Sequence, residues 1–250
     1  MMLRGKTILI TGAGRGLGKA IAARVGAQEA TLWLADLRTD WGAAAAAELR
    51  ADGVDARFVP VDLRDERSVD AMFATIAAAG PLYGVVNNAA LADGVGGKAI
   101  HELEVADWDR VLAVNLRGTF LVTRGAARAL IAAGDGGRIV TIGSDAALYG
   151  SPRLSHYIAS KGGVAALSRT VARDLGEFGI TVNTVSPGLT ESESAEFVPA
   201  HRHELYRLNR ALTRPQQPSD LVGAVAFLLG PEAGYITGQQ LVVDGGFVLH

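Results

Sequence analysis

The chain has 250 residues, of which 49% are hydrophobic and 20% charged, and its formal net charge is −2 at pH 7. This near balance argues against electrostatic binding to nucleic acid or to an anionic membrane. The absence of cysteine excludes disulfides, thiolate nucleophiles and cysteine metal sites. The sequence shows no signal peptide and no apolar run near the ~18 residues of a membrane span, so we expect a cytoplasmic protein.

Seven short apolar runs, rich in β-branched residues, predict buried strands. In chain order they cover 7–11, 31–36, 56–63, 83–90, 137–144, 180–188 and 241–246. Helical periodicity is found at 19–28, at 41–52, at 68–80 with Ser68 as a candidate cap, at 107–131, and around Tyr157. Strands and helices therefore alternate at βαβ spacing. This pattern predicts one Rossmann-like α/β domain over residues 1–250, a doubly wound seven-stranded parallel sheet with helices on both faces.

The polar and charged segment 190–217 interrupts this alternation before the last strand. Long insertions of this kind often close over a ligand. We expect a substrate lid at about 190–216, in which Phe197, Leu205 and Leu208 fold over the substrate. A fixed surface helix is the alternative.

The first strand runs directly into the glycine-rich loop TGAGRGLG at residues 11–18. Gly12, Gly16 and Gly18 would allow a tight turn, a close backbone approach to a pyrophosphate and a helix N-terminus aimed at it. The loop therefore indicates a dinucleotide site, although a glycine-rich turn that only packs is also possible.

Two carboxylates follow neighbouring predicted strands. Asp36 ends the second strand, where it would accept hydrogen bonds from an adenosine ribose and repel a 2′-phosphate. Arg15 favours the opposite, because its cation could bind that phosphate. Two unit charges about 4 Å apart interact by roughly 4 kcal/mol at an effective dielectric of 20. Asp36 would be the nearer charge, so NAD is favoured over NADP. Asp62 ends the third strand and could contact the adenine ring or cap the following helix.

Tyr157 and Lys161 lie one helical turn apart and would be neighbours. Alone, this spacing is compatible with a chance surface pair. Free tyrosine has a pKa of about 10, and a nearby ammonium would favour the phenolate that a base needs. The pair is thus a candidate acid–base unit.

Together, these motifs resemble the short-chain dehydrogenase/reductase family over essentially the whole chain. The matching positions are Thr11 to Gly18, the turn Asn87 to Ala90, Asn115, Ser144 thirteen residues before Tyr157, the Tyr157-x-x-x-Lys161 pair, and Pro187-Gly188. Ala90 replaces the family's usual glycine, a small change that should preserve the turn.

The resemblance implies an NAD(P)-dependent oxidoreductase that interconverts a secondary alcohol and a ketone, or an aldehyde- or hemiacetal-type substrate. Tyr157 would be the acid–base, Lys161 would also hold the nicotinamide ribose, and Ser144 would bind the substrate oxygen. Asn115 would position a water that links Lys161 to solvent. The implied cofactor contacts are Gly12, Arg15, Gly16, Leu17, Gly18, Asp36, Asp62, Leu63, Asn88, Tyr157, Lys161, Pro187, Thr190 and Ser192.

The endings PGLTESES and DGGFVLH look most like a branch that acts on small cyclic or aromatic alcohols. A 3-oxoacyl-thioester (acyl carrier protein) reductase using NADPH shares every motif, and Arg15 suits it. A non-catalytic dinucleotide sensor or scaffold is a third possibility, against which the intact Asn–Ser–Tyr–Lys set argues.

The C-terminal region resembles members that form homotetramers, and it is strongly apolar beside a predicted edge strand. No metal site is expected, because the five histidines (His101, His156, His201, His203 and His250) lack ligand spacing. Asp145, directly after Ser144, either lines the substrate pocket or is an ordinary loop acid.

Overall fold

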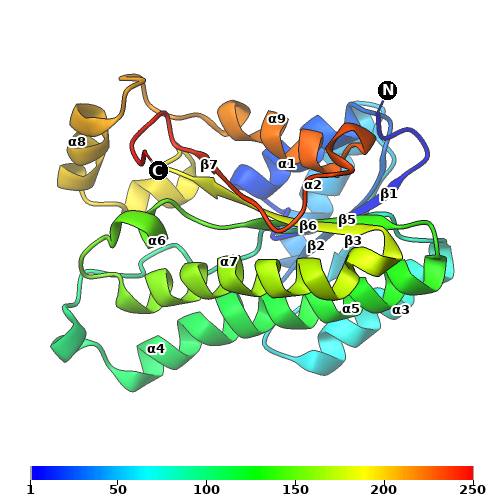
Figure 1. Ribbon diagram of the computed structural model, residues 1–250, viewed down its shortest axis with the longest axis horizontal. Helices are drawn as coiled ribbons and strands as arrows, with labels where there is room; N and C mark the ends of the chain where they lie inside the picture. Colours follow the sequence, from blue (N-terminus) through cyan, green and yellow to red (C-terminus); the bar gives the residue numbers. More distant parts are fainter. Residues whose placement is uncertain (1, 250) are drawn as a thin grey trace.

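Seven parallel strands form one sheet in the computed structural model, which describes residues 2–249 (Figure 1). Their order is β3-β2-β1-β4-β5-β6-β7. The strands are β1 (Thr7–Thr11), β2 (Thr31–Asp36), β3 (Ala56–Pro60), β4 (Gly84–Asn87), β5 (Gly137–Ile142), β6 (Ile180–Pro187) and β7 (Gln240–Val243). The predicted fold class is confirmed. His250 lies outside the described residues.

Helices cover both faces of this sheet. They are α1 (Gly16–Gly26), α2 (Thr39–Ala51), α3 (Glu66–Ala79), α4 (Val105–Leu112), α5 (Thr119–Ala133), α6 (Ala146–Tyr149), α7 (Ser155–Leu175), α8 (Ala200–Asn209) and α9 (Pro218–Leu229). Asp65, not Ser68, caps α3 and accepts a hydrogen bond from the Arg67 N–H. The Ser68 hydroxyl instead accepts from the Asp62 N–H at 2.9 Å. No described helix is long and apolar enough to cross a membrane.

The core has two layers because successive side chains of a strand point to opposite faces. Ile8 and Ile10 of β1 pack with α1, α2 and α9, whereas Leu9 packs with α3, α5 and α7. Figure 1 shows these two groups of helices above and below the sheet. Strands buried on both sides explain the continuous apolar runs of the sequence.

The predicted helix 107–131 is interrupted by a π-helical segment. Residues 113–118 form this wider turn between α4 and α5. Such segments are rare and frequently lie at functional sites. Here the segment contains Asn115, whose side chain is 1% exposed.

The segment 190–217 contains a short 3₁₀ helix at Glu193–Phe197 and then α8. Phe197, Leu205 and Leu208 are exposed on its surface in the protein without ligands. Tyr206 is the buried residue of α8.

Chain connections reverse direction between β1 and β4, since β2 and β3 lie on one side of β1 and the later strands on the other. Open α/β sheets bind ligands outside the carboxyl ends of the strands at such a switch point. The site described next lies there.

Candidate active site

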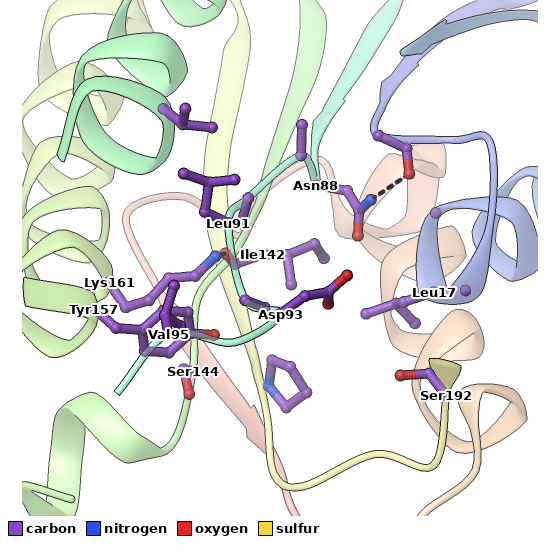
Figure 2. A pocket seen from close by; sticks show the side chains of 18 of the residues that line it. Leu17, Asn88, Leu91, Asp93, Val95, Ile142, Ser144, Tyr157, Lys161 and Ser192 are labelled. Atoms are coloured by element: carbon purple, nitrogen blue, oxygen red, sulfur yellow. Dashed lines mark hydrogen bonds between the residues drawn. The ribbon is translucent and has the colours of Figure 1, made fainter. Parts of the chain in front are cut away.

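A cleft of about 640 Å³ opens at the carboxyl edge of the sheet. Its size is typical of ligand pockets. The loops after β1 to β6 line it, together with residues of α7 and α8. Figure 2 shows Ser144, Tyr157 and Lys161 on one side, Leu17 and Ser192 on the other, and Asp93 between them.

The glycine loop forms the floor of one end of this cleft. Gly12 adopts φ +62, a conformation that favours glycine, and a Cβ there would lie 2.7 Å from the Ala89 Cα. A Cβ on Gly18 would overlap the carbonyl oxygen of Gly12. Gly16, Leu17 and Gly18 begin α1, so free N–H groups of the first turn face the cleft. This cradle has the backbone room and the helix terminus that a pyrophosphate requires.

Asn88 joins the glycine loop to the end of β4. Its Nδ2 donates to the carbonyl oxygens of Thr11 and Gly12, each at 3.0 Å. Figure 2 draws one of these two bonds. The Thr11 hydroxyl accepts from the N–H groups of Asn88 and Ala89 at 3.1 and 3.2 Å. Asn88 therefore stabilises the loop, and it lines the cleft from that position.

Asp36 lies at the end of β2 on the cleft wall. Its carboxylate accepts from the Gly14 N–H and from the Arg38 N–H, each at 2.9 Å. These two bonds fix the carboxylate beside the glycine loop, where an adenosine ribose would lie in a dinucleotide that follows the loop.

Arg15 pairs with Asp93, which lies in the loop after β4. Its guanidinium also lies over the ring of Trp41, 4.5 Å from the centroid. Arg38 covers the same ring at 4.4 Å and pairs with Asp40. Both cations near Asp36 thus already have carboxylate and aromatic partners. Sequence reasoning missed Asp93 and Trp41, because nothing in the local sequence links them to Arg15.

Asp62 and Leu63 follow β3 and both line the cleft. Asp62 pairs with Arg64 at 2.7 Å and also accepts from the Arg64 N–H. The Arg64 hydrogen bond holds the pKa of Asp62 below its usual range despite partial burial. Leu63 packs closely against Gly118. A Cβ added at Gly118 would lie only 2.8 Å from the Leu63 Cβ.

Tyr157 and Lys161 lie in the first two turns of α7, next to Ser144 at the end of the β5 loop. The Lys161 Nζ donates to the Ile142 carbonyl oxygen at 2.8 Å and lies 5.8 Å from the Tyr157 ring centroid. Burial lowers the pKa of Lys161 to about 8. Burial likewise raises the pKa of Tyr157 to about 12, although the Ser144 hydroxyl opposes this rise. In the protein alone, burial is the largest influence on the Tyr157 pKa, and Lys161 is not among the groups that lower it.

Asn115 does not contact Lys161 through its side chain. Its Oδ1 accepts from the Leu91 N–H at 2.7 Å, and its Nδ2 donates to the Leu91 carbonyl and to the Ser160 hydroxyl, each at 3.2 Å. Its own carbonyl accepts from the Thr119 hydroxyl at 2.7 Å. The side chain thus holds the loop after β4 against α7.

Pro187, Thr190 and Ser192 line the cleft after β6. Thr190 forms an isolated bridge with Gln216, and its hydroxyl donates to the Gly188 carbonyl at 3.2 Å. These contacts fix the start of the segment that leads to α8. Each predicted site residue except Asn115 lies on the cleft wall. Within residues 2–249 no group of three His, Asp or Glu side chains is arranged to hold a metal.

A polar chain that sequence reasoning largely missed closes the other end of the cleft. The Tyr206 hydroxyl donates to Asp145 Oδ1 at 2.8 Å and lies 3.3 Å from the Tyr149 hydroxyl. Arg202 donates to the Tyr149 hydroxyl at 2.9 Å. Phe247 stacks on Tyr206 with ring centroids 4.3 Å apart. The sequence left open whether Asp145 lines the substrate pocket or is an ordinary loop acid. In the structure it lines the cleft.

Similarity to known proteins extends over nearly the whole chain. Residues 12–248 match a family model described as enoyl-(acyl carrier protein) reductase. The chain is 35% identical to 2-(S)-hydroxypropyl-CoM dehydrogenase 3 of Xanthobacter autotrophicus, over 98% of this chain and 97% of that protein. It is 34% identical to (3R)-3-hydroxyacyl-CoA dehydrogenase of Rattus norvegicus, over 100% and 98%. A crystal structure of a short-chain type dehydrogenase/reductase from Mycobacterium marinum superposes with a TM-score of 0.92 at 30% identity, covering 99% and 97%.

The chain belongs to the short-chain dehydrogenase/reductase family. It is an enzyme of that family's kind, an NAD(P)-dependent oxidoreductase that acts on CH–OH groups. The alternative of a non-catalytic sensor is therefore set aside.

Asp145 should make the stability of the protein depend on pH. Burial, with a smaller contribution from Asp244, raises the pKa of Asp145 from 3.8 to about 7, while the Tyr206 hydrogen bond opposes the rise. The folded state then binds a proton more tightly than the unfolded state, so stability falls as pH rises from about 4 to 7. At pH 8 we expect Asp145→Asn to be more stable than the wild type by on the order of 4 kcal/mol, and at pH 4 about equal to it.

Urea unfolding at both pH values measures this difference. Asp220→Asn is the control of opposite sign, because the Arg214 hydrogen bond lowers the pKa of Asp220 to about 2. That variant should be less stable than the wild type at pH 8. Parallel pH slopes for the wild type and Asp145→Asn would contradict the assignment.

Proposed function

We propose that the protein is an NAD-dependent dehydrogenase of a small secondary alcohol, working reversibly on the corresponding ketone, aldehyde- or hemiacetal-type substrate. One observation carries the proposal. Ser144, Tyr157 and Lys161 meet on the wall of a cleft whose other end holds the Asp36 carboxylate beside the glycine loop. A nicotinamide dinucleotide laid along this cleft would supply the hydride acceptor.

Tyr157 moves the proton in this reaction. Its hydroxyl oxygen, as phenolate, accepts the proton of the substrate hydroxyl, and in the reverse direction it donates that proton to the carbonyl oxygen. Ser144 donates a hydrogen bond to the same substrate oxygen and stabilises the charge that develops on it. Both groups lie at the cleft end that Asp145 and Tyr206 also line.

The buried phenol needs positive charge before it can act as a base near neutral pH, since burial raises its pKa to about 12. Lys161 provides a cation one turn along α7, and an oxidised nicotinamide ring would provide a second. Lys161 is also placed to donate to the nicotinamide ribose. Asn115 acts through the Leu91 loop that it holds, which forms part of the cleft wall.

Asp36 supports NAD over NADP. Its carboxylate is fixed by the Gly14 and Arg38 N–H groups, so it cannot easily turn away from a 2′-phosphate. Arg15 and Arg38, which would attract that phosphate, are already paired with Asp93 and Asp40. The remaining cofactor contacts that we propose are the loop residues Gly12 to Gly18, Asp62, Leu63, Asn88, Pro187, Thr190 and Ser192.

The substrate end of the cleft is bordered by apolar side chains, among them Leu91, Val95, Leu154 and Val198. This lining suits a small cyclic or aromatic alcohol. The competing function is a 3-oxoacyl-thioester reductase that uses NADPH. The similarity to a protein named (3R)-3-hydroxyacyl-CoA dehydrogenase supports this alternative. The Asp36 carboxylate disfavours binding of NADPH. A substrate panel should therefore include a 3-oxoacyl thioester with each cofactor.

Tyr157→Phe should bind NAD with near-normal affinity but lose turnover by about 100- to 10,000-fold, because the ring still packs while the acid–base hydroxyl is gone. Steady-state kinetics on the best alcohol, with NAD affinity measured by titration, test this. Tyr83→Phe changes a tyrosine outside the cleft and should leave both quantities unchanged. Near-normal turnover of Tyr157→Phe would refute the proposed chemistry.

Asp36→Ala should change the cofactor preference. Removing the carboxylate deletes the repulsion of a 2′-phosphate, so the ratio of the NADP and NAD dissociation constants should shift toward NADP by about 100-fold or more. Asp52→Ala removes the same charge from the exposed end of α2 and should leave the ratio unchanged. A wild type that binds NADP more tightly than NAD would show that Arg15 governs the site.

We also propose that segment 190–216 closes as a lid over bound substrate. Ala195, Val198, Arg202 and Tyr206 of this segment line the cleft, which supports the idea. Amide hydrogen exchange of residues 200–209 should slow markedly when NAD and substrate bind. Equal protection with and without ligands would make α8 a fixed wall.

A homotetramer is the proposed assembly. β7 is an edge strand, and Phe227, Tyr235 and Leu241 near it are exposed apolar residues. Pairing across a two-fold axis would bury them. Light scattering at micromolar concentration should give four times the chain mass of 26.0 kDa, and a monomer would contradict the proposal.

A further inference from the structure

The arginines of the cleft differ in how their charge is neutralised. Five arginines line it: Arg15, Arg38, Arg64, Arg110 and Arg202. The first four pair with Asp93, Asp40, Asp62 and Asp107, respectively. Among the residues that the structure describes, Arg202 has no carboxylate within ion-pair distance. It is therefore the arginine of this cleft with a charge left to bind a ligand.

Arg202 is also incompletely hydrogen-bonded. Its Nε is buried and has no partner among residues 2–249, while one terminal nitrogen donates to the Tyr149 hydroxyl. A buried donor without an acceptor is costly, and a guanidinium offers its donors in a fork that matches an oxyanion. The guanidinium therefore has donor capacity that the described residues do not use.

Asp145 does not serve as that group. Its Oδ1 accepts from the Tyr206 hydroxyl, and its buried Oδ2 has no described partner. Burial raises its pKa to about 7, which reduces the negative charge near Arg202 at neutral pH. Arg202 and Asp145 thus interact electrostatically at a distance but do not form an ion pair.

Arg202 belongs to the substrate end of the cleft, not to the dinucleotide end. Its positive charge is among those that lower the pKa of Tyr157, so it acts close to the proposed reacting centre. It lies on α8, with Val198 and Tyr206 of the same segment on the cleft wall. One small molecule could place its carbinol at Tyr157 and a second group at Arg202.

We propose that Arg202 binds an oxyanionic group of the substrate, so that the natural substrates are secondary alcohols that carry a carboxylate or a sulfonate. This inference rests on the proposed dehydrogenase function and narrows its substrate class. The apolar lining then accommodates the carbon chain between the carbinol and the anion.

A matched pair of substrates tests the proposal. 3-Hydroxybutyrate and 3-hydroxybutyramide have nearly the same shape, but only the first is charged. With NAD, the wild type should show a kcat/KM for the acid at least about 10-fold above that for the amide, because charge-assisted hydrogen bonds are stronger than neutral ones. Hydroxy acids with the carbinol at carbon 2, 3 or 4, and a hydroxyalkyl sulfonate, then show which spacing and which oxyanion fit best.

Arg202→Gln should lower kcat/KM for the acid by at least about 10-fold more than kcat/KM for the amide, and Arg202→Lys should restore part of the preference for the acid. Arg207→Gln changes an exposed arginine of the same helix, paired with Glu204, and should keep the wild-type preference. Equal losses on both substrates in Arg202→Gln would reduce Arg202 to a residue that positions α8 through Tyr149. A wild type indifferent to the charge would also overturn the proposal.

Binding without turnover separates this inference from the proposed function. Tyr157→Phe saturated with NAD should bind 3-hydroxybutyrate more tightly than the amide in calorimetric titration, and adding Arg202→Gln should abolish the difference. Selective binding of the acid by an enzyme that oxidises no alcohol of the panel would support the Arg202 site and refute the dehydrogenase proposal. Turnover of neutral alcohols without any preference for the acid would do the reverse.

Discussion

The site depends on how closely the first strand, the glycine loop and α1 approach the end of β4. A Cβ on Gly18 would overlap the Gly12 carbonyl, so the helix can start this near the strand only because position 18 carries no side chain. Asn88 then fixes the two chain segments by donating to the carbonyls of Thr11 and Gly12. Because β1 and β4 adjoin at the switch point, these contacts shape the floor on which both halves of the cleft rest.

Burial has opposite consequences at the two ends of that cleft. At the dinucleotide end, most charges are paired at the surface: Arg15 with Asp93, Arg38 with Asp40, and Arg64 with Asp62. At the substrate end, burial favours the neutral forms of three groups. It raises the pKa values of Tyr157 and Asp145 and lowers the pKa of Lys161. The positively charged ring of an oxidised nicotinamide and the anionic group of the proposed substrate would then enter an environment with few competing ions and low solvent screening. Each new electrostatic contact there counts for more.

The alternation of apolar strands and periodic helices made the fold predictable, since each strand is buried on both faces and each loop carries glycine or polar residues. The local sequence also placed the glycine loop between the first strand and the first helix, and Tyr157 and Lys161 one turn apart on a helix, as the structure has them. Contacts between distant segments were not predictable: Arg15 meets Asp93 across 78 positions, and Tyr206 meets Asp145 across 61. The burial of Tyr206 in α8 was not predictable for the same reason, because its hydroxyl bonds to the distant Asp145. Ser68 was a candidate cap by residue type, but Asp65, three positions earlier, caps α3, and residue type alone does not distinguish the two.

The π-helical segment at residues 113–118 has a geometric consequence for its neighbours. Each residue of a regular α-helix rotates the chain by about 100°. A π turn holds one residue more than an α turn, so it changes the rotation of the preceding helix relative to the following one. α4 and α5 both pack against α7, so the rotation that the π turn adds between them sets which face each helix presents to that partner. The extra residue thus adjusts the relative rotation of α4 and α5, which both pack on α7. A single-residue deletion there would twist α4 by about a quarter turn and carry Asn115 away from the loop that it holds.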